Sequence, residues 1–288
     1  MSPAEGMETS RAAFSADIED YFQAEALRSF CPRSAWESFE DRTVPNTERL
    51  LEILGARGIQ GTFFVLGWTA KRHPDLVRRI AAAGHEIGSH GFDHELIYHQ
   101  NAEEFREDIR RGRHLLQDLS GQEVTGYRAP SYTVMTRTFW ALSIIAEEGF
   151  RYDSSIFPIA RRRYGMPRAP RWPHRIALDD GRSIVEFPLP TVRFGTLNAP
   201  ATGGAYLRLL PLRFQQWSVG RMLKAERPFV LSIHPWELDP GQPRFPVRPR
   251  TRWTHYHNLR HAESRLTALL SMGRFRTQAE VLRALELL

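Results

Sequence analysis

Short apolar runs alternate with longer amphipathic stretches along most of the chain. Short apolar or β-branched runs predict buried strands at 12–16, 62–66, 85–89, 124–128, 184–187 and 229–233, with a strand-to-loop passage at 152–155. Apolar residues at helical spacing predict helices near 46–54, 74–84, 102–119, 136–149, 258–270 and 278–288. This alternation favours a mainly parallel sheet with right-handed crossovers.

Helix boundaries are marked by recognisable end signals. Asn46 and Asn258 are expected N-caps, and Thr277 with Glu280 has the spacing of a capping box. About seven strands fit this α/β pattern, which favours a distorted (β/α)7 barrel that can be incomplete. Two Pro-rich segments, 160–173 and 235–249, are expected to be long irregular loops.

Composition narrows the class of protein further. The chain has 288 residues, of which 42% are hydrophobic and 25% charged, and this excludes disordered and fibrous classes. Its one cysteine, Cys31, excludes an internal disulfide. The net charge of +6 is spread along the chain apart from a basic run at 161–163, so we expect no nucleic-acid partner. No secretory signal and no membrane span are predicted, and we expect a cytoplasmic protein.

Polar residues with catalytic potential fall at or just beyond the ends of the predicted strands. In parallel barrels, chemistry gathers at the C-terminal ends of the strands, so these side chains are expected to meet at one mouth. They are Asp17, Glu19, Asp20, His90, His94, Arg128, Asp153 and His234.

A metal site is predicted in the segment GSHGFDH, which holds His90 and His94. The i, i+4 spacing would put both imidazoles on one side of a helical turn. Two nitrogens and a carboxylate oxygen suit zinc or a similar divalent cation, with a fourth position open to water. Strand alternation places Glu19 on the face of Asp17, whereas a turn after Asp17 would aim Asp20 inward. The third ligand is therefore left open between Glu19 and Asp20.

The remaining residues suggest proton transfer around that cation. Arg128 is expected to orient a carboxylate, and His234, at the end of a buried strand, suits a general acid near neutral pH. Asp153 is expected to orient the His234 imidazole. A backbone N–H near Tyr132 is expected to face an oxyanion. Aromatic side chains that could stack on sugar rings are Trp68, Tyr132, Trp236, Trp253 and Tyr256. For Arg208, contact with an acidic sugar and a structural role both stay open.

These residues and their flanking motifs resemble the polysaccharide deacetylases of the NodB-homology type, carbohydrate esterase family 4. The closer likeness is to the branch associated with exosortase and exopolysaccharide gene clusters. The matching segments are SADIEDYF (15–22), TFFVLGW (62–68), HPDLVRRIAAAGHEIGSHGFDH (73–94), YRAPSYT (127–133), YDSSIFP (152–158), GGAYLRLLP (203–211) and LSIHPWELDPGQPR (231–244). The combination of GHEIGSHGFDH with YRAPSYT is specific, and the match covers nearly the whole chain.

The resemblance implies a metal-dependent hydrolase that removes N-acetyl groups from N-acetylhexosamine units. By family likeness, Asp17 is the general base, His90 and His94 are metal ligands, Arg128 orients the base and His234 is the general acid. The acidic motif departs from the adjacent aspartates of most relatives, because Ile18 and Glu19 separate Asp17 from Asp20. A metal-free amidase acting on a small ureide, a non-catalytic glycan-binding barrel and an O-acetyl esterase remain alternatives.

The resemblance also predicts the organisation of the chain and its partners. One deacetylase domain is expected over 1–288, with its core at about 12–190 and 228–288 and a family-specific extension from about 195 onward. The expected substrate is a polysaccharide or a lipid-linked oligosaccharide, with peripheral contact at the inner membrane. Substrate binding is assigned to Tyr132 and Trp236, and the oligomeric state is left open.

Overall fold

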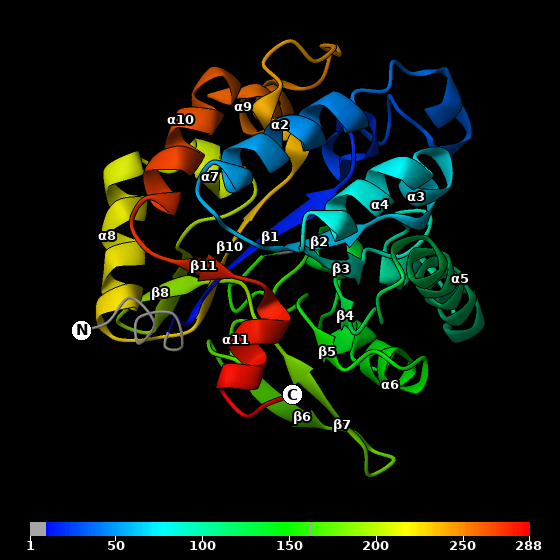
Figure 1. Cartoon of the computed structure of the whole chain (residues 1–288), viewed down its shortest axis with the longest axis vertical. Coiled ribbons are helices and arrows are strands. Elements are labelled where there is room, and N and C mark those ends of the chain that lie inside the picture. The colour runs from blue at the N-terminus through cyan, green and yellow to red at the C-terminus, as the bar shows by residue number, and fades with distance from the viewer. Residues whose placement is uncertain (1–9, 162) are drawn as a thin grey trace.

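The computed structural model describes residues 10–161 and 163–288, and a curled, mostly parallel sheet forms its centre (Figure 1). Within this described part, the sheet has nine strands in the order β10-β1-β2-β3-β4-β5-β7-β6, with β11 paired to the start of β1. Its strands are β1 (Ala12–Ile18), β2 (Thr62–Val65), β3 (Glu86–Ser89), β4 (Gly126–Tyr127), β5 (Tyr152–Asp153), β6 (His174–Ala177), β7 (Ser183–Glu186), β10 (Phe229–Ile233) and β11 (Phe275–Arg276). The strands β8 (Thr191–Phe194) and β9 (Leu197–Pro200) pair with each other in a separate sheet.

The sheet curls without closing. Every neighbouring pair from β10 to β7 along the order is parallel, and only the β6–β7 pair is antiparallel. Among the described strands, β10 and β6 each have a partner on one side only, so the barrel stays open between them. The predicted distorted and incomplete (β/α)-barrel is confirmed.

Helices cover the outer face of the curled sheet (Figure 1). They are α2 (Thr43–Gly55), α3 (Gly67–Arg72), α4 (Pro74–Ala82), α5 (Ala102–Ser120), α6 (Ala141–Glu147), α7 (Ala205–Leu209), α8 (Leu212–Lys224), α9 (Pro249–Tyr256), α10 (Leu259–Leu270) and α11 (Gln278–Ala284). In α4, Pro74 occupies the first turn and Leu76, Val77 and Ile80 are buried, as helical spacing predicts. These apolar stripes pack on strands such as β1, whose seven residues are all buried.

Two predicted N-caps differ from the structure. The helix α2 begins at Thr43, so Asn46 lies within its first turns. Carboxylates from outside the helix serve this end, because Asp20 Oδ2 accepts from Arg42 N at 2.5 Å and Asp41 Oδ1 accepts from Thr43 N at 3.0 Å. These carboxylates accept from backbone N–H groups at the start of α2, and the helix therefore begins at Thr43 and not at Asn46.

Asn258 precedes α10 but its side chain does not cap that helix. It donates instead to the Arg208 carbonyl at 3.0 Å. The capping box of Thr277 and Glu280 at α11 is confirmed, with both reciprocal hydrogen bonds present. The capping prediction is therefore confirmed for Thr277, whose side chain bonds within its own helix. It is wrong for Asn258, whose side chain binds a carbonyl distant in the sequence.

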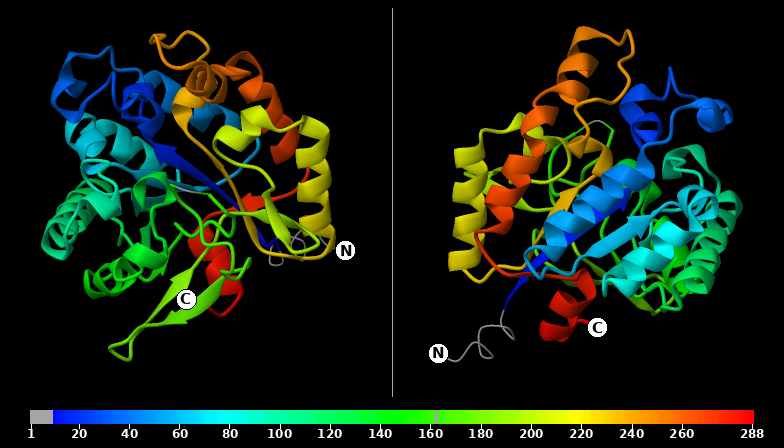
Figure 2. Two further views of the ribbon diagram at one scale, coloured as in Figure 1. Left: turned by 180° about the vertical axis from the view of Figure 1, so that it is seen from behind. Right: turned by 45° about the horizontal axis from the view of Figure 1, so that its top comes forward.

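Beside the main sheet lies a region, from β8 to α8, in which the sequence analysis predicted no strand or helix. The antiparallel hairpin β8–β9 forms a small second sheet, and α7 and α8 follow it along the chain. Figure 2 shows the hairpin next to α8 at the edge of the molecule, as Figure 1 does. No helix among the described residues combines the length and apolar character needed to cross a bilayer.

Candidate active site

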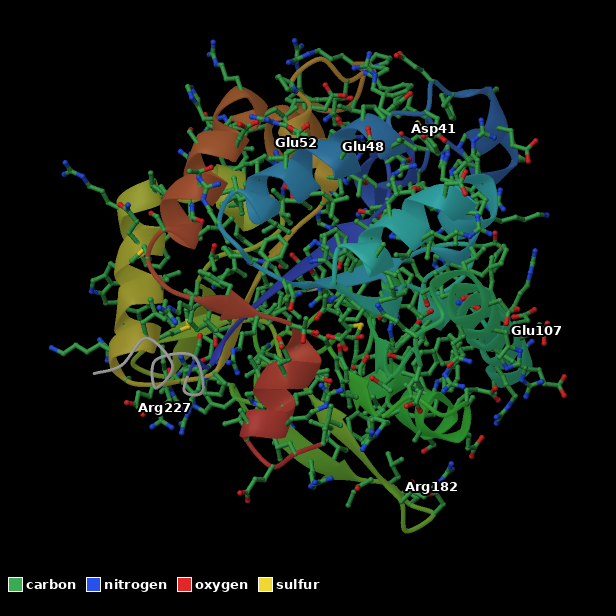
Figure 3. All side chains as sticks on the ribbon, in the orientation of Figure 1. Asp41, Glu48, Glu52, Glu107, Arg182 and Arg227 are labelled. Carbon is green, nitrogen blue, oxygen red and sulfur yellow. The ribbon has the colours of Figure 1, made fainter. Side chains whose placement is uncertain are left out.

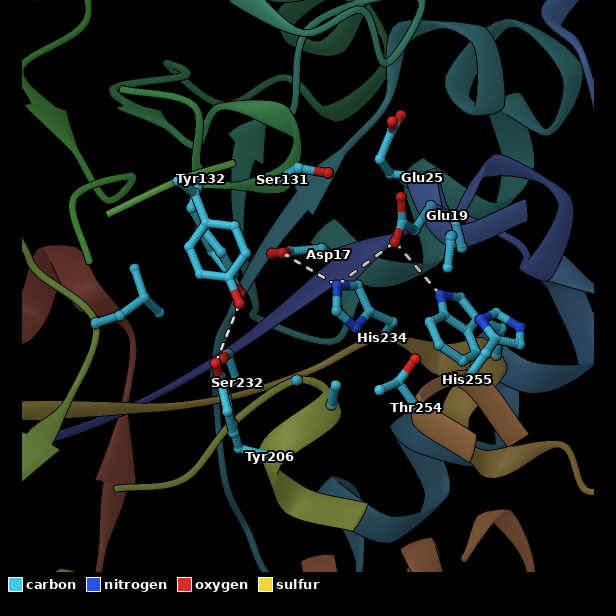
Figure 4. Close-up of a pocket in the computed structure, with 18 of the residues that line it drawn as sticks. Asp17, Glu19, Glu25, Ser131, Tyr132, Tyr206, Ser232, His234, Thr254 and His255 are labelled. Carbon is cyan, nitrogen blue, oxygen red and sulfur yellow. Dashed lines mark hydrogen bonds and ion pairs between the residues drawn. The ribbon is translucent and has the colours of Figure 1, made fainter. Parts of the chain in front are cut away.

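The strand ends bring two carboxylates and three imidazoles to one pocket of about 230 Å³ (Figure 4). Asp17 lies near the end of β1, and Glu19 follows directly after the strand. Because β1 runs through Ile18, alternation holds beyond Asp17 and both carboxylates face this pocket. His90 follows β3 and His234 follows β10, so three parallel strands deliver these groups to the same edge of the sheet.

Glu19, His90 and His94 form a buried group with the geometry of a ligand set. One ligand atom from each lies within 4.8 Å of the others. His90 Nδ1 donates to the Arg128 carbonyl oxygen at 2.8 Å, which directs Nε2 as the free nitrogen. Burial lowers the pKa of His90 to about 4, so the imidazole is neutral and able to ligate at neutral pH.

The Glu19 carboxylate is held among positive or donor groups. Burial alone would raise its pKa, but His94, His234 and His90 lower the pKa of Glu19 well below its usual value. Its Oε2 lies 2.8 Å from His94 Nε2, yet this buried oxygen accepts no hydrogen bond of acceptable geometry. A buried carboxylate grouped with two imidazoles is a donor set that fits a cation. Among the described residues, this donor set suits a divalent metal.

The histidine loop differs from the predicted helical turn. Residues 90–96 contain no helix, and Gly91 and His94 adopt positive φ angles of 74° and 53°. Asp108 on α5 holds this loop by accepting from Phe92 N at 2.8 Å and Asp93 N at 3.1 Å. A non-glycine residue with positive φ carries backbone strain, which is common at functional sites. The two imidazoles still meet, with ring centroids 5.3 Å apart.

Asp20 does not join this group. Its carboxylate caps a short 3-10 helix, η1 (Tyr21–Gln23), by accepting from Tyr21 N at 2.7 Å, and it also accepts from Arg42 N. Burial raises the pKa of Asp20 to about 7 against these backbone donors. Of the two acids left open by the sequence, the structure brings Glu19 to the histidines and gives Asp20 a structural role.

Arg128 holds Asp17 from behind the pocket. Its Nη1 donates to Asp17 Oδ1 at 2.6 Å and to Ser15 Oγ at 2.8 Å, while Nε and Nη2 bind the Ser154 carbonyl and hydroxyl. The guanidinium is fully buried. Four hydrogen bonds fix the plane of this side chain, so one oxygen of Asp17 is fixed and Oδ2 is left 3.7 Å from His234 Nε2.

His234 is held by Glu237, not by the predicted Asp153. The Glu237 carboxylate accepts from His234 Nδ1 at 2.9 Å and from its backbone N at 3.1 Å. Asp153 accepts instead from the Ser155 hydroxyl at 2.5 Å and does not line the pocket. The prediction for Asp153 is wrong because β5 directs its carboxylate toward Ser155. The i+3 spacing in His-Pro-Trp-Glu is a capping-box signal that could have found Glu237.

Arg208 binds Glu237, the residue that holds His234. Its Nε donates to Glu237 Oε1 at 2.7 Å, and its Nη1 donates to backbone carbonyls at 254, 255 and 257. Burial alone would raise the pKa of Glu237, but Arg208 and His234 lower it to about 2. Glu237 is therefore an anion at neutral pH. Of the two roles left open for Arg208, the structure shows the structural one, because this side chain holds Glu237 and three backbone carbonyls.

The charge around His234 favours its protonated form. Burial alone would lower its pKa, but Glu19, Glu237 and Asp17 together raise the pKa of His234 to about 9. Its Nε2 lies 3.4 Å from Glu19 Oε1 and faces the pocket, as the dashed lines in Figure 4 show. His234 can therefore carry a proton at neutral pH beside Asp17, the carboxylate that Arg128 fixes.

Only some of the aromatic residues predicted to stack on sugar rings line the pocket. Tyr132 and Trp236 line the pocket, whereas Trp68, Trp253 and Tyr256 do not. Trp236 stacks on His234 and His255, with ring centroids 5.5 Å and 4.5 Å away, and is only 5% exposed, so its ring positions side chains. Sequence reasoning missed three aromatic residues of the pocket wall, which are Phe157, Tyr164 and Tyr206. They come from loops and from α7, where no periodic signal marks them.

The loop at Tyr132 also differs from its prediction. Tyr132 N donates to the Ala129 carbonyl at 3.0 Å, so this N–H already has an internal partner. Ser131 and Tyr132 have φ angles of 52° and 56°, and the loop is strained at both residues. The Tyr132 side chain, and not its N–H, faces the pocket in this structure.

Comparison with known proteins agrees with this geometry. Residues 28–152 match the family model described as polysaccharide deacetylase, and residues 154–283 match one described as a domain of unknown function, DUF3473. The first of these segments, which carries His90, His94 and Arg128, is thus similar to polysaccharide deacetylases. A structure from Mycobacterium smegmatis described as a candidate polysaccharide deacetylase has a TM-score of 0.61 and 26% identity, and covers 96% of this chain and 89% of its own.

Curated relatives of this deacetylase segment share it over part of their length. Peptidoglycan deacetylase of Helicobacter pylori is 31% identical over 113 residues, which are 38% of this chain and 36% of the relative. Chitooligosaccharide deacetylase of Rhizobium leguminosarum bv. trifolii is 31% identical over 37% of this chain and 52% of the relative. The chain thus spans about a third to a half of these relatives. They support the prediction of a deacetylase hydrolase at the level of the family.

An allantoinase structure shares the fold alone. Its TM-score is 0.63 at 15% identity, and it covers 96% of this chain and 90% of its own. The barrel therefore occurs with more than one chemistry, and the reaction has to be argued from the site.

Proposed function

We propose that the chain hydrolyses the N-acetyl amide of N-acetylhexosamine units in a polysaccharide. The observation that carries this proposal is that one pocket holds a carboxylate fixed by Arg128, a protonated His234 and the group of Glu19, His90 and His94. Amide hydrolysis needs a base for water, an acid for the leaving amine and stabilisation of a charged oxygen. A protein that only binds glycans needs none of these together.

The ligand group fits a divalent cation, and zinc is the cation that we propose. His90 is neutral, its Nδ1 is occupied by the Arg128 carbonyl, and its Nε2 is therefore the nitrogen available to a cation. Glu19 Oε2 is buried and lies 2.8 Å from His94 Nε2, so the three side chains are already gathered. Two imidazoles and one carboxylate are typical of catalytic zinc sites with three protein ligands. When bound, such a cation supplies positive charge that polarises a carbonyl group and acidifies water.

The proton transfers are assigned to the chain's own side chains. Asp17 Oδ2 removes a proton from the attacking water while Arg128 keeps Oδ1 in place. The water oxygen bonds to the acetyl carbon, and the C–N bond breaks as His234 Nε2 donates a proton to the amine nitrogen. Glu237 holds the other nitrogen of His234 throughout. Acetate and a free amino sugar result, so atoms and charges balance.

The pocket wall suits one sugar unit. Phe157, Tyr164, Tyr206 and Tyr132 present aromatic surface, against which the apolar face of a pyranose ring can pack. Arg208 also lines the pocket, where it holds the Glu237 carboxylate.

The biological setting is a further part of the proposal. The likeness of residues 203–211 and 231–244 to the exosortase-associated branch supports a role in exopolysaccharide biosynthesis. A polysaccharide or lipid-linked oligosaccharide would then be the substrate, with action in the cytoplasm. This setting rests on the resemblance alone.

Removal of the metal is expected to abolish deacetylation. The full chain is incubated with N-acetylglucosamine oligomers, and acetate and free amine are measured before chelation, after chelation and after zinc is restored. We expect acetate in the first and third samples only, because a positive charge at the ligand group polarises the acetyl carbonyl. Full activity after verified metal removal would contradict the metal proposal. Ring opening of allantoin without acetate release would favour the ureide amidase.

Variants of the adjacent acids Glu19 and Asp20 test which one binds the metal and which one caps a helix. Glu19→Gln is expected to lose bound zinc, measured as metal per protein after dialysis. Asp20→Ala is expected to keep zinc but to lower the free energy of unfolding by about 1–2 kcal/mol, because a capping acceptor for two backbone N–H groups is lost. Denaturant unfolding measures the second effect. Loss of zinc from Asp20→Ala with retention in Glu19→Gln would reverse the assignment.

A further inference from the structure

A cluster of exposed apolar side chains lies on the β8–β9 hairpin and α8. Phe194 and Leu197 face each other at the hairpin end and are 51% and 72% exposed, and Trp217 on α8 is 45% exposed. Half-buried Phe214 joins them. The Phe194 ring lies 6.0 Å from Trp217 and 6.4 Å from Phe214, so the four side chains form one continuous surface. We call these four residues the aromatic surface. It lies outside the pocket.

Basic residues surround the aromatic surface. The hairpin contributes Arg193, and α8 contributes Arg213, Arg221 and Lys224, all exposed. No aspartate or glutamate occurs in residues 187–225, between Glu186 and Glu226. Within 10–161 and 163–288, none of these four basic side chains takes part in an ion pair.

Two further arginines extend this basic surround. Arg171 is bonded to Thr191 Oγ1 at 2.8 Å, and Arg227 lies at the lower end of α8, where Figure 3 labels it. Burial lowers the pKa of Arg171, and repulsion from Arg193, Arg221 and Arg227 lowers it further. These charges are therefore close enough to repel one another. The labelled acids Glu48 and Glu107 lie elsewhere, on α2 and α5 (Figure 3).

We propose that the aromatic surface and its surrounding basic residues dock the protein on anionic phospholipid bilayers. Exposed Phe, Leu and Trp side chains enter the headgroup region, and Lys and Arg beside them contact lipid phosphates. Charge complementarity favours this occupant. The proposal is independent of the reaction assigned to the pocket.

Other occupants fit the surface less well. A second copy joined by a two-fold axis would place one basic cluster near another, which is repulsive. Carboxylates commonly accept hydrogen bonds from the hydroxyl groups of neutral glycans, and 187–225 has no carboxylate to offer. An anionic lipid surface satisfies the apolar and the charged parts together.

Vesicle sedimentation tests the proposal directly. The full chain is mixed with vesicles of phosphatidylcholine alone or with an equal part of phosphatidylglycerol. We expect binding to the anionic vesicles only, weakened by high salt because screening shortens the reach of surface charges. Trp217→Ala is expected to weaken binding by about tenfold or more, because the variant lacks an aromatic side chain that would be buried in the headgroup region. Arg221→Glu is expected to weaken it by a similar factor.

Matched variants separate docking from general effects. Trp253→Ala removes another exposed tryptophan, which is 53% exposed on α9, and Lys71→Glu makes the same charge change on α3. Both are expected to bind anionic vesicles as the wild type does, and thermal unfolding checks that every variant folds.

Three results would overturn the proposal. They are absence of binding to anionic vesicles, equal losses in test and control variants, and a lipid-free dimer that Trp217→Ala dissociates. Binding of alginate, an anionic polysaccharide, that depends on Trp217 without any vesicle binding would instead assign the surface to glycans. Acetate release is measured in parallel, so failure of docking is distinguishable from failure of the proposed reaction.

Discussion

Asp17→Asn is expected to lower kcat for acetate release by about 10²–10⁴-fold, the usual contribution of a general base. The amide keeps an oxygen for Arg128 Nη1, which donates to Asp17 Oδ1 at 2.6 Å, so the local geometry can persist. What is lost is the carboxylate oxygen Oδ2 that faces His234 and the pocket. Steady-state assays of acetate and amine give kcat and KM separately, and KM is expected to change little.

Asp153→Asn provides the matched control for Asp17→Asn. Asp153 is as deeply buried as Asp17 and lies at the end of β5, but its carboxylate binds Ser155 and does not line the pocket. Its activity is expected to stay close to that of the wild type. Denaturant unfolding of both variants separates loss of chemistry from loss of fold. Equal losses of kcat in folded Asp17→Asn and Asp153→Asn would reject Asp17 as the base.

His234→Ala is expected to cause a loss of similar size, about 10²–10⁴-fold in kcat, because the leaving amine then has no proton donor. The wild-type activity is expected to fall as the pH rises through about 9, the pKa to which Glu19, Glu237 and Asp17 raise His234 against its burial. The sign follows from the role, since a raised pKa keeps the acid protonated below that pH. A pH profile of kcat/KM measures this alkaline limb. Wild-type rates in folded His234→Ala would reject the assignment.

Glu237→Gln tests how that proton is held. Removal of its negative charge is expected to move the alkaline limb to lower pH by about 1–3 units. Glu237→Asp keeps the charge, so its limb is expected to remain near the wild-type position. Glu186→Gln replaces an equally buried carboxyl outside the pocket, whose pKa is raised by burial and by Asp153, and is expected to leave the limb in place. An unshifted limb in folded Glu237→Gln would limit Glu237 to a structural role, and a failure of Glu237→Gln to fold would leave the Asp variant as the test.

The alternation of strands and helices could be predicted from the sequence because it depends on local periodicity and on end signals. The fully buried β1 and the Pro74 start of α4 follow from their own residues. Parallel topology then brings the polar strand ends to one mouth. The sequence therefore determined that Asp17, His90 and His234 would meet.

Contacts between distant segments decided the rest. Glu19 and Asp20 are adjacent in sequence, and they separated only because β1 runs one residue past Asp17 and the start of α2 delivers Arg42 N to Asp20. For His234, the local His-Pro-Trp-Glu spacing indicates Glu237 as a partner. That Asp153 points toward Ser155 depends instead on how β5 is placed in the curled sheet.

The sequence by itself thus determined the elements, the mouth of the barrel and the kinds of side chain that gather there. Only the tertiary structure decided which carboxylate faces the histidines, that Asp153 points away from His234, and that α8 and the β8–β9 hairpin join their aromatic residues into one surface. The physical reason is that periodicity and capping act over a few residues, whereas these contacts depend on packing between segments far apart in the chain.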